Sequence, residues 1–446
     1  MVFHFHLLRN HFLCMDRLTA NRYCIIGAGT SGLTVAKNFL QAQIPFDCLE
    51  REDEIGGNWN FGKPNSSIYD STHLISSKQL TEYTDFPMPQ EYPEFPNHRQ
   101  VLEYLRAYAQ NFGINEHIQF ETSVDSLTPR ENGWRVRLSS GEERLYRGVV
   151  IANGHNWDPR LPEYAGEFSG TTVHSSEYKT PDILKDQRVL VVGGGNSGCD
   201  LAVESSLHAA RAFVSWRRGY HLLPKFFKGK PIDQCGETLL KLRLPLWMRR
   251  LGAAMVIRWV LGPAELAGLP KPDHRLFESH PIINSRLHGQ VAHGDLTVKP
   301  DIVEFDGTAV RFVDGTVEEV DVILFATGFK LSFPFIDQQY LNWQEGRPNL
   351  YLNVFHPDYD NLFFAGLIQP DSGQWGLVDY QAQLISKYLS QTKREKNTTS
   401  IINARKRSSR QKSHWRVGYL ETPRHLLEVE HFSYRRQLQK LIQKFA

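Results

Sequence analysis

Two similar glycine-rich stretches decide the fold of this chain: IIGAGTSGLT, Ile25–Thr34, and VVGGGNSGCD, Val191–Asp200. Each follows a short apolar run rich in β-branched residues, Tyr23–Ile26 and Val189–Val192, of the kind that forms a strand buried on both faces. A strand, a G-x-G-x-x-G turn and a helix together present a helix N-terminus to the pyrophosphate of a dinucleotide. The sequence therefore predicts two nucleotide-binding units in one chain.

The same alternation of strands and helices continues outside these two stretches. Val320–Ala326 is a third buried apolar run, Gln100–Gln110 has a helical pattern, and no solenoid-length repeat is present. Such a pattern is typical of layered α/β proteins with right-handed crossovers. We expect an α/β fold with two Rossmann-like dinucleotide-binding domains, the second inserted in the first.

The first motif has the features of an FAD site. Gly27 permits the tight turn, Gly29 lets the backbone approach a pyrophosphate, and Gly32 allows close packing of the helix. Glu50, which ends the run FDCLE, supplies the carboxylate expected on a ribose hydroxyl about 20 residues after the glycines. A glycine turn that binds nothing is the alternative, but the strand, the helix and Glu50 together argue against it.

A second glycine pair follows in EIGGNWN, Glu54–Asn60. Its glycines would let the backbone pass close to a bulky ligand, and Trp59 offers a flat aromatic face. Taken alone, this stretch fits a surface turn equally well.

The second motif indicates NADPH. Gly193, Gly195 and Gly198 repeat the glycine spacing, but the following strand ends in VSWRRG and has no carboxylate. Arg217 and Arg218 would attract the 2′-phosphate of NADPH, where an acidic residue would repel it. A solvated arginine pair at a strand end is the alternative interpretation.

Composition excludes several classes of function. The chain has 446 residues with 51 Lys and Arg against 49 Asp and Glu, a net charge of +2, so no nucleic-acid partner is expected. Its five cysteines include no CxxC pair, which argues against a zinc site and against a pyridine-nucleotide disulfide reductase. We expect reduced thiols, no metal and a cytoplasmic protein.

A third motif carries a family resemblance. FSGTTVHSSEYK, Phe168–Lys179, matches the pattern F-x-G-x-x-x-H-x-x-x-(Y/F)-(K/P), and from about Asn21 onward the chain resembles the flavin-containing monooxygenases, bacterial type, which are class B flavoprotein monooxygenases. Baeyer–Villiger enzymes are similar but carry Trp at the position of Tyr178. His174 is expected to be structural, as a packed linker residue. Three further stretches agree with the family: Ser76–Pro89, Phe325–Phe329 and Phe363–Gly376.

The resemblance implies cofactor contacts at specific positions. For FAD these are Gly27, Gly29, Ser31, Gly32, Glu50, Asn58, Trp59 and Ser76. For NADPH they are Gly193, Gly195, Asn196, Ser197, Gly198, Asp200 and Arg217. No residue is assigned a catalytic role.

The resemblance also implies the reaction. NADPH reduces FAD, O2 forms a C4a-hydroperoxyflavin, and one oxygen atom passes to a small amine or sulfide. The implied enzyme is an oxidoreductase similar to N,N-dimethylaniline monooxygenase (EC 1.14.13.-). Baeyer–Villiger oxygenation of ketones is an alternative.

One position departs from the family pattern. Many members carry SNSSK where this chain has LISSK, so Ile75 stands at the position of an Asn beside the flavin. An isoleucine side chain can neither donate nor accept a hydrogen bond. This leaves two alternatives open: an uncoupled NADPH oxidase that produces hydrogen peroxide, and a non-catalytic flavoprotein that senses redox state.

The expected domain boundaries follow from these motifs. They are an N-terminal extension at 1–20, an FAD-binding part at 21–165, an NADPH-binding domain at 166–319 with a helical insertion at about 220–294, and a second FAD-binding part at 320–446 with a basic segment from Lys393. The opening MVFHFHLLRNHFLC makes a poor secretory signal.

Leu239–Gly262 mixes arginines with Leu, Trp and Met and is too charged to span a membrane. We favour a lid over the active site or a subunit contact, such as that of a homodimer. Peripheral contact with a membrane surface is the alternative.

Overall fold

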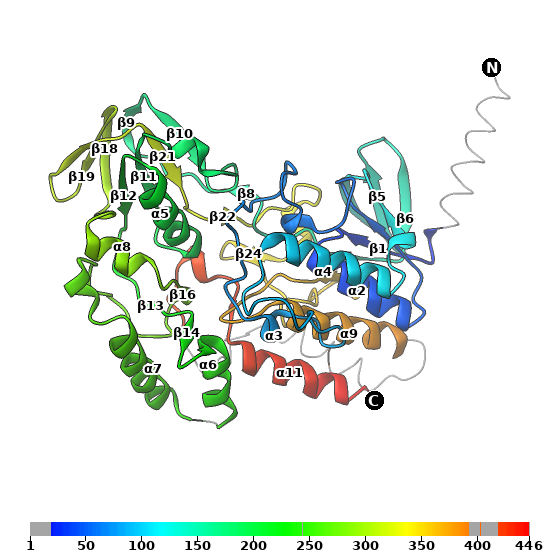
Figure 1. Cartoon of the computed structure of the whole chain (residues 1–446). Helices are drawn as coiled ribbons and strands as arrows, with labels where there is room; N and C mark the ends of the chain where they lie inside the picture. The colour runs from blue at the N-terminus through cyan, green and yellow to red at the C-terminus, as the bar shows by residue number, and fades with distance from the viewer. Residues whose placement is uncertain (1–18, 243, 392–401, 403–417, 446) are drawn as a thin grey trace, which may run out of the picture.

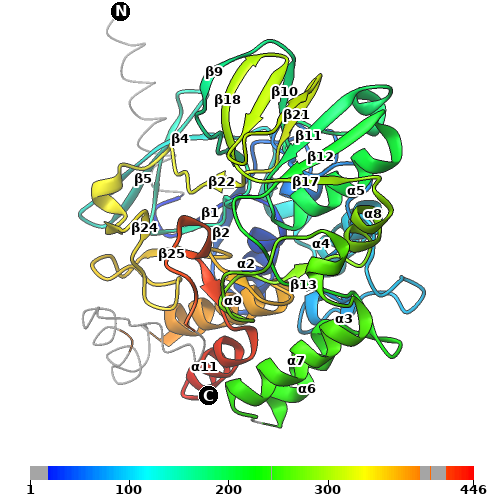
Figure 2. The same cartoon turned by 90° about the vertical axis from the view of Figure 1, so that its left-hand side faces the viewer.

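The computed structural model describes residues 19–242, 244–391, 402 and 418–445. The predicted N-terminal extension, apart from Thr19 and Ala20, lies outside the described residues. So does the basic run that begins at Lys393, apart from Ile402. Two units stand side by side, each built on a parallel sheet (Figures 1 and 2).

The first unit is built on a five-stranded parallel sheet. Its order is β25 (Leu362–Phe364), β7 (Gly148–Ile151), β1 (Tyr23–Ile26), β2 (Phe46–Leu49) and β3 (Ile118–Gln119). The β1 strand has the predicted bounds and is fully buried, with Ile26 in register with Leu49 and Ile151. The sequence prediction of a central parallel strand is therefore confirmed.

Different layers cover the two faces of this sheet. Helices α2 (Thr30–Gln41), α4 (His98–Asn111) and α9 (Trp375–Gln391) pack on one face, and α11 (His431–Gln443) packs on α9. The antiparallel strands β4 (Val124–Arg130), β5 (Gly133–Leu138) and β6 (Glu143–Tyr146) cover the other face. Because both faces of the sheet are covered, the sequences of its strands are continuous apolar runs.

The α4 helix corresponds to the predicted helix at 100–110 and begins two residues earlier. Asn97 caps it: its side chain accepts hydrogen bonds from the backbone N–H groups of Arg99 and Gln100, both at 3.0 Å. The Gln100 side chain in turn accepts from the Asn97 N–H, which completes a capping box. The cap sets the start of the helix before the apolar pattern begins.

The second unit repeats the parallel architecture. Its sheet has the order β10 (Thr171–His174), β21 (Val322–Phe325), β11 (Arg188–Val192), β12 (Arg211–Ser215) and β17 (Thr297–Lys299). Helices α5 (Asn196–His208) and α8 (Leu287–His293) pack on one face. A second sheet of β20 (Val317–Glu319), β19 (Ala309–Phe312), β18 (Ile302–Gly307) and β9 (Ala165–Phe168) lies against the other.

Strand pairing moves one of the expected domain boundaries. The β21 strand lies in the segment expected to belong to the second FAD-binding part, yet it pairs with β10 and β11 in the second unit. The chain returns through β22 (Phe329–Lys330), which pairs with β8 (Asp158–Pro159), and then adds β25 to the first sheet. The expected start at residue 320 is thus about six residues too early.

The insertion in the second unit is mostly helical. It contains α6 (Ile232–Lys241), α7 (Leu246–Val260) and the short helix η4 (Ala264–Ala267). Short strands accompany them: β13 (Leu222–Leu223) pairs with β16 (Ile282–Ile283), and β14 (Phe226–Phe227) pairs with β15 (Lys230–Pro231). Among the described helices, none has both the length and the apolarity needed to cross a bilayer.

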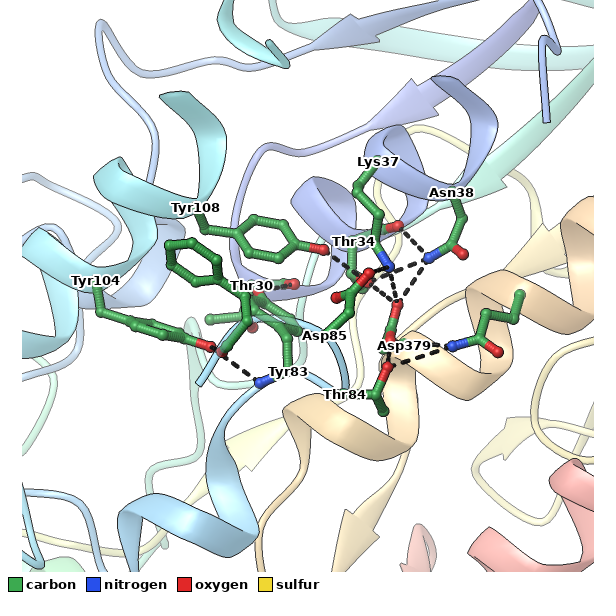
Figure 3. A network of polar contacts seen from close by, with 12 residues as sticks. Thr30, Thr34, Lys37, Asn38, Tyr83, Thr84, Asp85, Tyr104, Tyr108 and Asp379 are labelled. Atoms are coloured by element: carbon green, nitrogen blue, oxygen red, sulfur yellow. Dashed lines mark hydrogen bonds and ion pairs between the residues drawn. The ribbon is translucent and has the colours of Figure 1, made fainter. Parts of the chain in front are cut away.

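A buried polar network ties α2 to α9 in the first unit (Figure 3). The Lys37 ammonium lies 2.9 Å from a carboxylate oxygen of Asp379, and both side chains are buried. Thr34, Asn38 and Thr84 also donate hydrogen bonds to Asp379. Burial of charge is costly unless each charge is paired and hydrogen-bonded, and here both conditions are met.

Candidate cofactor-binding cleft

A single cavity of about 1310 Å³ runs between the two units. Residues that follow the carboxyl ends of the parallel strands line it, including Gly27 after β1, Ala152 after β7, Gly193 after β11, Ala326 after β21 and Arg217 after β12. This is where open α/β sheets bind ligands. The cavity is larger than the roughly 300–1,000 Å³ typical of a pocket for a single small ligand.

The first glycine turn excludes side chains at Gly27 and Gly32. Gly27 has a φ of +102°, and a Cβ on Gly32 would lie 1.7 Å from the Gly27 carbonyl oxygen. A Cβ on Gly57 would lie 3.0 Å from the Cα of Gly29, so the EIGGNWN stretch packs directly on the turn. Residues 56–59 of this stretch also line the cavity, so the stretch forms part of the cavity wall.

Glu50 follows β2 and is buried beside the turn. One of its carboxylate oxygens accepts a 2.6 Å hydrogen bond from the Ala28 N–H, and the other accepts from the Glu52 N–H at 3.0 Å. Burial raises the pKa of the carboxyl, while these two N–H groups favour its ionised form. Glu50 lines the cavity at the predicted ribose position and also holds the turn in shape.

Asn58 and Trp59 have different roles in the cavity wall. The Asn58 side-chain oxygen accepts a 2.6 Å hydrogen bond from the Ser67 N–H, so it orders the neighbouring loop. The Trp59 ring packs edge-on against Trp375 at a centroid distance of 6.0 Å. Both residues, together with Ser31, line the cavity.

Ser76 and Ile75 lie side by side on the same wall. The Ser76 hydroxyl is 2.7 Å from the Thr81 hydroxyl and is buried. Ile75 also lines the cavity, so an apolar side chain occupies this part of the surface. The next residue, Ser77, donates its N–H to Asp233 of α6 at 2.6 Å, which brings the insertion against this wall.

The second glycine turn repeats the geometry of the first. Gly193 has a φ of +132°, and a Cβ there would lie 2.3 Å from the carbonyl oxygen of Ala326. A Cβ on Gly198 would lie 2.1 Å from the Gly193 carbonyl oxygen. Gly195 is the N-cap residue of α5 in extended conformation, so the N-terminus of that helix opens on the cavity.

Three polar residues at the start of α5 line the cavity, but two are already engaged. The Asn196 side chain accepts from the Ile283 N–H at 2.9 Å and donates to the Pro281 carbonyl at 3.0 Å. Asp200 accepts a 2.8 Å hydrogen bond from Asn284, and burial raises its pKa to about 6. Both therefore hold the 281–284 segment in place, whereas Ser197 is exposed at the cavity surface and its side chain hydrogen-bonds with Tyr69.

The two arginines of VSWRRG separate into different environments. Arg218 pairs with Asp273 at 3.2 Å. Arg217 lines the cavity and has no ion pair or side-chain hydrogen bond to any described residue. The two arginines therefore do not share one environment: Arg218 is held by Asp273, while Arg217 is exposed at the cavity surface.

His174 ends β10 of the second unit and bonds to the segment that follows β21. Its ring nitrogens lie 2.8 Å from the Ser176 hydroxyl and 3.1 Å from the Gly328 carbonyl oxygen. Burial lowers its pKa, which keeps the ring neutral near pH 7. His174 does not line the cavity among the residues that the structure describes.

Two features of the cavity could not be predicted from the sequence motifs. The Tyr220 ring covers Gly194, because a Cβ on that glycine would lie 2.1 Å from the ring. The C-terminal segment at 422–427 lines the cavity from the other side, although it lies some 230 residues after the second turn. No periodicity or spacing links that segment to the turn.

The segment Leu239–Gly262 has an unexpected orientation. Its α7 helix directs Trp247, Leu251, Met255 and Trp259 outward, and Trp259 is 86% exposed. Arg249 of the same helix is buried. The apolar face of α7 therefore points away from the cleft. The insertion contacts the first unit through α6, through the Phe226 ring against Phe95, and through the buried Arg249 of α7, whose charge acts on Asp371.

Comparison with known proteins gives a consistent match. The family model described as Flavin-binding monooxygenase-like matches residues 20–444. Flavin-containing monooxygenase 5 of Rattus norvegicus is 37% identical over 380 residues, which are 79% of this chain and 70% of that protein. Dimethylaniline monooxygenase (N-oxide-forming) 2 of Oryctolagus cuniculus is 33% identical over 392 residues, which are 82% of this chain and 72% of that protein.

Solved structures confirm the predicted fold. The NADP⁺-bound cyclohexanone monooxygenase from Rhodococcus sp. Phi1 superposes with a TM-score of 0.69 at 18% identity, over 96% of this chain and 98% of that chain. The S-allyl-L-cysteine S-oxygenase from Allium sativum superposes with a TM-score of 0.66 at 20% identity, over 95% of this chain and 89% of that chain. At these identities the likeness establishes the shared fold.

Proposed function

The chain belongs to the flavin-binding monooxygenase-like family, whose members use FAD, NADPH and O2, and on this premise we propose that it oxygenates small amines or sulfides at nitrogen or sulfur. The name of the rabbit relative, an N-oxide-forming dimethylaniline monooxygenase, supports the substrate class. Tyr178 stands where Baeyer–Villiger enzymes carry Trp, which argues for heteroatom substrates over ketones. The bacterial type stays a prediction, because the relatives compared above are mammalian.

One observation carries the proposal: both glycine turns open on the same cavity. Gly27 and Gly193 each follow the carboxyl end of a parallel strand, and both line the space between the units. A hydride donor held by one turn and an acceptor held by the other can then meet without leaving the cleft. The fit is chemical as well as spatial, because helix N-termini favour the phosphates that both dinucleotides carry.

The proposed roles of the side chains follow from their positions. Glu50 would hold the FAD ribose, and Arg217 would hold the 2′-phosphate of NADPH. When bound, FAD supplies the redox chemistry, taking a hydride and activating O2. The cavity walls would orient the cofactors and exclude water, because contact with bulk solvent would consume the activated oxygen before it reached the substrate.

A product balance tests the proposal. The FAD-loaded enzyme is given NADPH and air with a thioether, N,N-dimethylaniline or a cyclic ketone, and sulfoxide, N-oxide, lactone and hydrogen peroxide are measured per NADPH consumed. We expect sulfoxide or N-oxide nearly equal to NADPH. Peroxide as the main product would instead establish an uncoupled oxidase, and lactone would establish a Baeyer–Villiger enzyme. Absence of flavin bleaching by NADPH under nitrogen would identify a non-catalytic flavoprotein.

We further propose that the enzyme rests peripherally on an anionic membrane surface through α7. The outward face of that helix carries two tryptophans, Trp247 and Trp259, with Leu251 and Met255 between them. Tryptophan favours the boundary between headgroups and acyl chains, where one end of the ring is apolar and the other wet. An apolar patch of this kind on a folded protein marks an interaction site.

Local charge selects a membrane over a second copy of the chain. Between Lys225 and Arg258 the sequence contains eight Lys and Arg but only Asp233 and Glu237 as acids. Arg249 is buried and Arg250 and Lys241 are paired with Glu278 and Glu237, so the positive charge of the described surface comes from Lys225, Lys228, Lys230 and Arg258. Both acids are engaged within the protein, Asp233 by Ser77 and Glu237 by Arg435. Two copies of this surface would repel one another, whereas anionic headgroups would attract it.

Vesicle flotation tests this location. We expect the protein to float with vesicles containing one third anionic lipid, to float less with neutral vesicles, and to lose binding after Trp247→Ser and Trp259→Ser. Val313→Ser, at an exposed apolar position of the second unit, is the matched control and should bind as the wild type does. Concentration-dependent dimers abolished by the tryptophan changes, with no vesicle binding, would overturn the membrane proposal in favour of a homodimer.

A further inference from the structure

The C-terminal segment at 418–428 lies across the cleft and is bonded to both units. On the second unit, the Leu420 N–H donates to the Glu278 carbonyl at 2.8 Å, and His280 pairs with Glu428 at 3.0 Å. On the first unit, β27 (Glu428–Val429) pairs with β26 (Gln369–Pro370). The segment therefore has a fixed position relative to both cofactor turns.

Within this segment, Arg424 points at the second glycine turn. A guanidinium nitrogen of Arg424 is 3.7 Å from the place where a Cβ on Gly195 would stand. Its guanidinium carbon lies 5.6 Å from the centre of the Tyr220 ring, and that ring covers Gly194. Tyr220 and Arg424 thus flank the turn at the N-terminus of α5.

Arg424 has no anionic partner in the part of the chain that the structure describes. No side-chain hydrogen bond or ion pair joins it to any described residue, and it is half-buried on the cavity wall. This contrasts with Arg218, which is paired with Asp273, and with Arg435, which is paired with Glu237. A half-buried guanidinium without a counter-ion is costly unless an anion meets it.

The neighbouring residues hold Arg424 in place but add no second charge. His425 lies 2.7 Å from the Thr422 hydroxyl through one ring nitrogen and 3.1 Å from the Ser279 hydroxyl through the other. Burial, followed by the repulsion of Arg424, lowers the pKa of His425 to about 4. At neutral pH the anion-binding charge on this segment is therefore that of Arg424.

We infer that Arg424 binds the pyrophosphate of NADPH. The glycine turn and α5 form one side of this site, and the C-terminal segment forms the other. The turn supplies backbone N–H groups and the helix N-terminus, while the guanidinium supplies the fixed positive charge. Because the segment is bonded to both units, the bound cofactor is held against each of them. The inference rests on the NADPH site and is independent of the substrate.

The test separates the pyrophosphate from the 2′-phosphate. Dissociation constants of NADP⁺, NAD⁺ and adenosine 2′-monophosphate are measured by flavin fluorescence on the FAD-loaded protein for Arg424→Ala, Arg424→Lys and Arg217→Ala. Loss of Arg424 should weaken NADP⁺ and NAD⁺ alike, by about tenfold to a hundredfold, and leave adenosine 2′-monophosphate unchanged. Arg424→Lys should recover part of the affinity. Arg217→Ala should weaken NADP⁺ and adenosine 2′-monophosphate but not NAD⁺.

Controls keep a structural role apart from a binding role. Arg436→Ala, at an exposed arginine of α11, should bind all three ligands as the wild type does. FAD content and melting temperature should be unchanged in Arg424→Ala. Unchanged NADP⁺ affinity would overturn the inference, and so would loss of adenosine 2′-monophosphate binding, which would place Arg424 at the 2′-phosphate. Because these are binding measurements, failure to oxygenate amines or sulfides would not affect them.

Discussion

Lys37 and Asp379 form a buried ion pair, 2.9 Å long, that fastens the helix of the first glycine turn to a helix more than 300 residues later in the chain. Lys37 belongs to α2, which begins at Thr30 directly after the turn, and Asp379 belongs to α9. The Tyr83 hydroxyl extends the connection by donating a 2.6 Å hydrogen bond to the Thr30 carbonyl (Figure 3). The position of the first glycine turn therefore depends on a residue of the returning chain.

We predict that Asp379→Ala destabilises the first unit strongly. Among the described residues, the change leaves the Lys37 ammonium with the partly exposed Asp85 as its acidic partner. It also removes the acceptor of four other donors, Thr34, Asn38, Thr84 and Gln383, and breaking a buried pair typically costs about 3–5 kcal/mol. Thermal unfolding followed by flavin fluorescence should show release of FAD at a markedly lower temperature. Asp306→Ala, at an exposed strand end, serves as the control, and an equal effect of both changes would contradict the prediction.

A second prediction concerns the choice between NADPH and NADH. Arg217→Ala should raise the KM for NADPH by tenfold or more and leave the KM for NADH nearly unchanged, because a charge-assisted contact is worth about 1.5–3 kcal/mol. Arg218→Ala should have a smaller effect, since its guanidinium is paired with Asp273. Steady-state oxidation of each cofactor measures both constants. Equal losses with NADPH and NADH would mean that another residue reads the 2′-phosphate.

Much of the fold could be predicted because the decisive signals are local. The strand, turn and helix around Gly27 and Gly193 depend on neighbouring residues, and β1 has the predicted bounds. The assignment of β21 could not be predicted, because an apolar run shows that a strand is buried but not which sheet receives it. The boundary expected at residue 320 failed for this reason.

The site was predictable to a similar extent. Gly27, Gly29, Gly193, Gly195, Glu50 and Arg217 line the cavity. Gly32 and Gly198 are not among its lining residues and instead pack behind the turns, against the carbonyls of Gly27 and Gly193. Asn196 and Asp200 also line it, but their side chains are bonded to the 281–284 segment, which no spacing connects to them. The outward orientation of the apolar face of α7 could not be predicted either, because an amphipathic pattern does not show which face of the helix packs on the protein.

The burial of Asp200 leads to a prediction of pH dependence. Its pKa is raised to about 6 when folded, mainly by burial, against about 3.9 for a free carboxyl. The folded state therefore holds the proton more tightly, and the stabilisation from this group is full below about pH 4 and lost as the pH rises through 6. Asp200→Asn, which can still accept from Asn284, should match the wild type near pH 4 and exceed its stability by up to about 2 kcal/mol at pH 7.

Urea unfolding of the two proteins across this pH range measures the difference. The wild-type stability should fall relative to that of the variant as the pH increases. A gap that stays constant from pH 4 to pH 7 would show that Asp200 keeps an ordinary pKa in the folded protein.

The last prediction concerns Ile75, which places an apolar side chain on the cavity wall next to Ser76. Asparagine there would supply a donor and an acceptor, whereas the Ser76 hydroxyl is already engaged with Thr81 at 2.7 Å. Ile75→Asn should therefore lower the hydrogen peroxide released per NADPH and raise the sulfoxide yield correspondingly. Ile75→Leu, which keeps the wall apolar, should leave the ratio of the two products unchanged. If both variants give the wild-type ratio, the position does not control coupling, and backbone groups or bound NADP⁺ must supply the polar contact.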